Sequence, residues 1–107
     1  MSLPLRRRAR ADADVADAVE WYVSAAGADV ALDLIDEIER AYRVIAEVPT
    51  IGSPQIGYEV GVPGLRAFAV ERFPYAIFTM AYTDRVEVWR VLHTARDLGS
   101  LFVTDSP

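Results

Sequence analysis

Two stretches in the first half of the chain repeat apolar side chains with the period of an α-helix. Between residues 12 and 26 the apolar positions lie three and four residues apart, at Val15, Ala18, Val19 and Tyr22. The stretch 28–48 continues the same pattern, at Ala31, Leu34, Ile35, Ile38, Tyr42 and Ile45. This spacing places the apolar side chains on one face of a helix and leaves the charged ones to water. Two amphipathic helices are therefore predicted.

The two predicted helices are separated by a single residue, Gly27, and the second is followed by Pro49. Glycine readily adopts the backbone conformations that end a helix, and proline cannot continue one. Because the connection is so short, the two helices are predicted to form an antiparallel hairpin.

The second half of the chain changes to a period of two. Aromatic and β-branched residues fill the segments 65–70, 75–82 and 86–93, which is typical of strands. The links Glu71–Pro74 and Thr83–Arg85 are short enough for hairpins. The three segments are therefore predicted to form an antiparallel meander.

The remaining segments carry weaker patterns. Residues 3–9 predict a short N-terminal strand, and residues 49–64, with three prolines and four glycines, predict an irregular loop. Residues 94–107 are expected to be irregular or to form a short helix. Residues 1–107 are thus predicted to form one α+β domain of order β-α-α-β-β-β, with the helix hairpin packed on a small antiparallel sheet.

Both faces of the predicted sheet are apolar. On segment 75–82, one face carries Tyr75, Ile77, Thr79 and Ala81, and the other carries Ala76, Phe78, Met80 and Tyr82. A sheet covered on one face alone should show polar residues on the other. An uncovered apolar surface usually marks a partner site. Either a partner or the chain's own C-terminal tail is expected to cover this face.

Charge and residue usage exclude many classes of protein. The 107 residues carry a net charge of −5 and contain no cysteine, no lysine and one histidine, His93. Disulfides, thiolate sites, P-loop and Schiff-base lysines and sites with two imidazoles are excluded. The acidic balance disfavours strong direct binding of nucleic acid. We expect a cytoplasmic protein with no membrane span, no metal and no cofactor.

Two groups of basic residues stand out against this acidic background. Arg66, His93 and Arg96 lie at or just beyond predicted strand ends, where they are expected to form a small cationic cluster. The other group is the N-terminal run of Arg6, Arg7, Arg8 and Arg10, either a solvated edge or a basic arm for a partner. The carboxylates show no pair whose spacing indicates acid–base catalysis.

Four segments carry a resemblance to a known family. They are "ARADADVADAVEWY", "VPTIG", "LRAFAVERFPYAIFTMAY" and "VEVWRVLHTARD", which occur in this order over about residues 9–97. With this order and spacing the chain resembles the ParE-like branch of the ParE/RelE superfamily of bacterial toxin–antitoxin toxins, also described as plasmid stabilisation system proteins.

The resemblance implies a β-α-α-β-β-β fold and a toxin of a type II toxin–antitoxin system. It implies a hetero-oligomer with a ParD-like antitoxin, which has a ribbon-helix-helix N-terminus and a C-terminal segment that folds on the toxin. DNA gyrase is the target that it implies. The expected antitoxin-binding residues on the apolar sheet face are Phe78, Met80, Tyr82 and Trp89, and the expected target-binding residues are Arg66, His93 and Arg96.

The branches of the superfamily differ in mechanism. RelE-like members cut messenger RNA on the ribosome with basic residues on the central strands, and the matching positions here are Ala67, Ala69 and Ala76. A ribonuclease needs a base, an acid and a group that stabilises charge, which alanine cannot supply. No catalytic residue and no enzymatic activity are therefore expected. Two alternatives stay open: a ribosome-dependent mRNA interferase, or a degenerate toxin that only binds its antitoxin.

Overall fold

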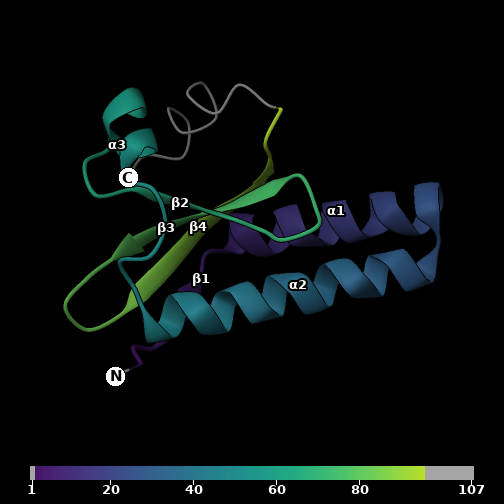
Figure 1. Ribbon diagram of the computed structural model, residues 1–107, viewed down its shortest axis with the longest axis horizontal. Coiled ribbons are helices and arrows are strands. Elements are labelled where there is room, and N and C mark those ends of the chain that lie inside the picture. The colour runs from purple at the N-terminus through teal and green to yellow at the C-terminus, as the bar shows by residue number, and fades with distance from the viewer. Residues whose placement is uncertain (1, 96–107) are drawn as a thin grey trace.

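A helical hairpin lies on one side of a four-stranded sheet, and a short third helix lies on the other side (Figure 1). The computed structural model describes residues 2–95. The helices are α1 (Ala9–Ala26), α2 (Ala28–Glu47) and α3 (Gln55–Val60). The strands are β1 (Leu5–Arg7), β2 (Arg66–Ala69), β3 (Tyr75–Ala81) and β4 (Val86–His93).

The predicted hairpin of α1 and α2 is confirmed, with Gly27 as its turn. Gly27 has a φ of 97°, and its N–H donates to the carbonyl oxygens of Tyr22 and Val23. A positive φ of this kind favours glycine over any residue with a Cβ. Val48 ends α2 with one further hydrogen bond, to Val44, directly before Pro49.

The sheet is mixed, which corrects the prediction of an antiparallel sheet. Its strand order is β1-β4-β3-β2, with β2, β3 and β4 antiparallel and β1 parallel to β4. In the parallel pair, Leu5 lies opposite Val86 and Arg7 opposite Val88. The whole chain between these strands forms the crossover that parallel neighbours require. Strand β1 is shorter than predicted because α1 already begins at Ala9.

A β-bulge in β4 reverses the faces of the residues that follow it. Phe78 pairs with Arg90 and Thr79 pairs with Val88, so Trp89 is the extra residue. Val88 and Val91 therefore both belong to the core under the helical hairpin, although they are three residues apart. Trp89 points to the opposite face. Strict alternation would place Trp89 and Val91 on one face, and the bulge places them on opposite faces.

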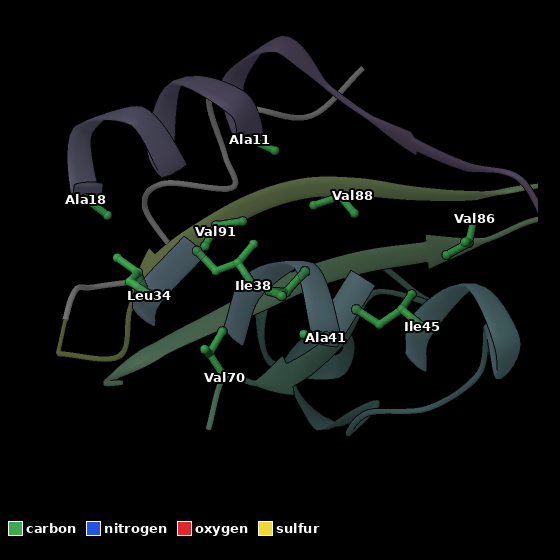
Figure 2. Close-up of a cluster of buried hydrophobic side chains, with 11 residues drawn as sticks. Ala11, Ala18, Leu34, Ile38, Ala41, Ile45, Val70, Val86, Val88 and Val91 are labelled. Carbon is green, nitrogen blue, oxygen red and sulfur yellow. The ribbon is translucent and has the colours of Figure 1, made fainter. Parts of the chain in front are cut away.

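The main core lies between the helical hairpin and the sheet. Figure 2 shows Leu34, Ile38 and Ile45 of α2 directed toward valines of β4. From α1, the small residues Ala11 and Ala18 face this core and are almost completely buried. Small side chains allow α1 to lie close to β4, because no large group separates the two backbones.

The second core lies on the opposite face of the sheet. Phe78, Trp89 and Leu92 are buried there against Leu65, with Ile56 and Val60 of α3 packed over them. The segment predicted as an irregular loop therefore contains a helix, and this helix covers part of the face that was expected to be covered by a partner or by the C-terminal tail. A Cβ on Gly57 would lie 2.7 Å from the Val62 carbonyl oxygen. Only glycine permits this approach between α3 and the chain that follows it.

Thr79 provides a test of the packing in the sheet. Its side chain is completely buried, and Oγ1 has no hydrogen-bond partner among residues 2–95. Such a hydroxyl loses its bonds to water and gains none in return. Thr79→Val, which nearly keeps the shape, is expected to raise the free energy of unfolding by about 1 kcal/mol in urea denaturation. The exposed Thr83→Val is the control, and a loss of stability in Thr79→Val would contradict the prediction.

Candidate functional site

The predicted cationic cluster does not form, because Arg66 and His93 lie at opposite ends of the sheet. Arg66 pairs with Thr79, whereas His93 pairs with Tyr75. These two positions on β3 are about 13 Å apart along the strand, and β2 and β4 lie on opposite sides of β3. Arg96 lies outside the described residues. The expectation failed because the sequence shows that Arg66 and His93 lie near strand ends, but it does not show which strand ends lie at the same end of the sheet.

Arg66 joins the edge strand β2 to the loop that follows α2. Its Nη1 donates to the carbonyl oxygen of Gly52 at 3.2 Å, and the side chain is half-buried. Within residues 2–95 it makes no ion pair with a carboxylate. Arg66 therefore holds a loop in place, with a cationic head at the sheet edge.

His93 lies at the end of β4 against an aromatic neighbour. Its ring centroid is 5.3 Å from that of Tyr75 in an edge-to-face arrangement, and its Nδ1 accepts a hydrogen bond from the Ala95 N–H at 3.1 Å. Together with α1, these residues border a cleft at this end of the sheet. His93 is thus oriented by its own chain.

The four predicted antitoxin-binding residues do not line an open groove. Phe78 is 0% exposed and Trp89 is 3% exposed, because both belong to the core beneath α3. Met80 is half-buried at the same core, and Tyr82 is exposed over 37% of its surface. Only Met80 and Tyr82 keep surface that a partner can reach without moving α3.

Two arginines stack on aromatic rings near the turn between β3 and β4. The Cζ of Arg8 lies 3.9 Å from the ring centroid of Trp89, and the Cζ of Arg85 lies 4.1 Å from that of Tyr82. Both arginines bind Glu87, through Arg8 Nη2 at 3.3 Å and Arg85 Nε at 3.0 Å. We call these five residues the arginine–aromatic cluster.

The carboxylate of Glu87 stabilises the arginine–aromatic cluster. Burial raises the pKa of Glu87, but hydrogen bonds from Arg85 and Trp89 and the charge of Arg8 outweigh it, so the net shift of this pKa is downward. Asp84 forms a second ion pair with Arg85. The two arginines of the cluster are therefore balanced by two carboxylates, Glu87 within the cluster and Asp84 beside it.

A buried ion pair joins α1 to β4. Arg90 binds Asp14 through Nε at 2.8 Å and Nη2 at 3.0 Å, and both side chains are almost completely buried. Asp14 Oδ2 also accepts the Val91 N–H at 3.0 Å. Asp14 was interpreted as part of the solvated face of a helix. An arginine between the apolar residues Trp89 and Val91 of a strand was the available signal that a buried carboxylate faces it.

The strand positions that would serve a ribonuclease carry methyl groups. Ala67 and Ala69 lie on β2, and Ala76 lies buried on β3.

Among residues 2–95 there is no group of three side chains that could hold a metal ion. No helix of the described part of the chain is long and apolar enough to cross a membrane.

Comparison with known proteins identifies a family and similar solved structures. The sequence pattern of the family described as "ParE toxin of type II toxin-antitoxin system, parDE" matches residues 5–98. Among solved structures, the chain is similar to one from P. aeruginosa described as a chromosomal ParDE TA system, with a TM-score of 0.74 and 22% sequence identity. That match covers 86% of this chain and 96% of the other. No curated protein matches this sequence.

Removal of the buried carboxylate tests the link between α1 and β4. Asp14→Ala takes away the partner of a buried arginine and the acceptor of the Val91 N–H. We expect the free energy of unfolding to fall by about 3 kcal/mol in chemical denaturation. Asp17→Ala, on the same helix but exposed, is the matched control. Equal losses in the two variants would show that the pair adds nothing.

Stability at acid pH tests the role of Glu87. Because the pKa of Glu87 is lowered in the folded state, its contribution is complete above the ordinary value of 4.5 and is lost as the pH falls through the folded pKa. Glu87→Gln should therefore be less stable than wild type at pH 6, with a difference that shrinks toward pH 3. Thermal unfolding across this range measures it. Glu71→Gln, in an exposed turn, is the control, and a constant difference for Glu87→Gln would refute the prediction.

Proposed function

This chain belongs to the ParE toxin family of type II toxin–antitoxin systems, and from that premise we propose that it poisons DNA gyrase without catalysing a reaction. A ParD-like antitoxin with a ribbon-helix-helix N-terminus neutralises it in a hetero-oligomer, in the cytoplasm. The observation that carries the proposal is the family match over residues 5–98, which includes the segments that first indicated the resemblance.

Local chemistry supports a non-catalytic mode of action. Ala67, Ala69 and Ala76 provide no proton donor, acceptor or cation on β2 and β3. His93 uses Nδ1 for a hydrogen bond within its own chain. Cleavage of RNA requires an acid, a base and a stabiliser of negative charge, and the described residues do not gather these groups at one place.

Arg66 and His93 act separately in this proposal. Each provides a contact for the target at its own end of the sheet, and Arg96 remains a candidate beyond the described residues. Arginine suits such contacts because its planar head binds carboxylate or phosphate with two hydrogen bonds. For the antitoxin, Met80 and Tyr82 offer accessible surface next to α3, whereas Phe78 and Trp89 support it from below.

A second candidate function is a degenerate toxin that retains only antitoxin binding. Two observations favour it. The ParE-like pattern commonly has an arginine after the tyrosine of "FPY", where this chain has Ala76. The net charge of −5 is unusual for these toxins. In this case the folded surface for the antitoxin remains while the contacts to the target are lost.

Assays with purified protein distinguish the candidates. We expect the wild-type protein to inhibit supercoiling by gyrase and to accumulate cleaved DNA, with no cut in ribosome-bound messenger RNA above background. Absence of one charge-stabilising contact typically costs about 10²–10³ in rate, so three alanines leave no useful cleavage. Message cut at codon boundaries would instead establish the ribosome-dependent mRNA interferase. Failure of both activities with intact antitoxin binding would establish the degenerate toxin.

A further inference from the structure

The end of the sheet that holds His93 has a cleft of about 660 Å³ between α1 and the start of β3. Pro74 and Tyr75 form one wall, Trp21 and Tyr22 of α1 form the other, and His93 lies between them. We call it the helix–sheet cleft. Neither the arginine–aromatic cluster nor α3 contributes to it.

Aromatic rings form a continuous lining. The ring centroids of Trp21 and Tyr22 are 4.8 Å apart, those of Tyr22 and Tyr75 are 6.3 Å apart, and His93 follows at 5.3 Å. Trp21 exposes 60% of its surface at the mouth. A tryptophan left this open to water offers a large apolar area to a partner, together with a ring face that attracts cations.

The charged groups of the lining are all acidic. Asp14 and Asp17 border the cleft, and no arginine among residues 2–95 does. Asp14 is already bound by Arg90, whereas Asp17 is exposed and makes no ion pair with any residue in the described part of the chain. An aromatic cleft with a carboxylate at its edge complements a cationic side chain, which gains both a charge partner and a ring face.

We propose that the helix–sheet cleft binds an arginine or lysine side chain carried on an apolar segment of the antitoxin. The choice of the antitoxin as the carrier rests on the proposed function. The apolar neighbours of the cationic residue cover Trp21 and Tyr22, and its charged head lies against Asp17. Opposite charge fixes the register of the segment, and the aromatic walls exclude water around it.

Matched peptides test the cleft without any antitoxin. Full-length ¹⁵N-labelled protein is titrated with acetyl-Leu-Arg-Leu-amide and with the same peptide carrying citrulline, which has the shape of arginine without its charge. We expect the arginine peptide alone to shift the amide signals of Trp21, Tyr22 and His93. Equal shifts with both peptides, or none, would overturn the proposal. The latter is the result expected if residues 96–107 or a second copy of the chain occupies the cleft.

Variants then connect the cleft to the antitoxin. Asp17→Asn removes the exposed charge and Trp21→Leu removes the ring, and each should weaken binding of the antitoxin encoded beside this gene about tenfold. The controls are Asp36→Asn on α2 and Tyr58→Leu on α3, which are both exposed. Thermal unfolding verifies that all four variants fold.

The outcomes separate this proposal from that on gyrase. Unchanged antitoxin affinity in Asp17→Asn and Trp21→Leu would overturn the assignment of the cleft, whatever the gyrase assay shows. Weakened affinity in these two variants and not in the controls would support it, even if gyrase proved not to be the target.

Discussion

The contact of Asp14 with Arg90 and Val91 of β4 positions α1 on the sheet. One carboxylate binds two nitrogens of Arg90 and the backbone N–H of Val91, so it fixes both the position of the helix and its rotation about its axis. Removing a buried charge from water is costly, and a bidentate geometry with a third hydrogen bond offsets that cost. Because Trp21 lies seven residues after Asp14, on the same face of α1, this rotation also directs Trp21 over the helix–sheet cleft.

The bulge at Trp89 distributes β4 between two cores. Without it, Val88 and Val91 would lie on opposite faces of the sheet. With it, both pack under the helical hairpin, while Trp89 and Leu92 pack beneath α3. One additional residue thus decides which side chains of this central strand enter each layer. The buried Arg90 follows directly after the bulge, beside α1, where Asp14 receives it.

Local patterns in the sequence predicted the hairpin of α1 and α2 and the three antiparallel strands, because their periods depend on neighbouring residues alone. The parallel pairing of β1 with β4 joins residues far apart in the chain, and no local period reports it. Helix α3 was missed because its six residues contain a glycine and lie among prolines. For the same reason the cover of this sheet face was assigned to a partner or to the C-terminal tail, and not to residues 55–60. Of the site residues, His93 was found from its rarity, whereas Trp21 and Asp17 lie in a helical pattern that gives them no distinct signal.

The place of β4 in the sheet has a consequence for synthesis of the protein. It is the last strand of the described residues 2–95, yet it lies between β1 and β3. At 5–20 residues per second, roughly 4–16 s pass between the synthesis of Leu5 and that of Val86, about eighty residues later. During that time the apolar stripe of α2 has no sheet to cover it, and β1 has no neighbour with which to pair. A chain that still lacks β4 therefore cannot join β1 to β3, so the four-stranded sheet forms only after Val86–His93 has been synthesised.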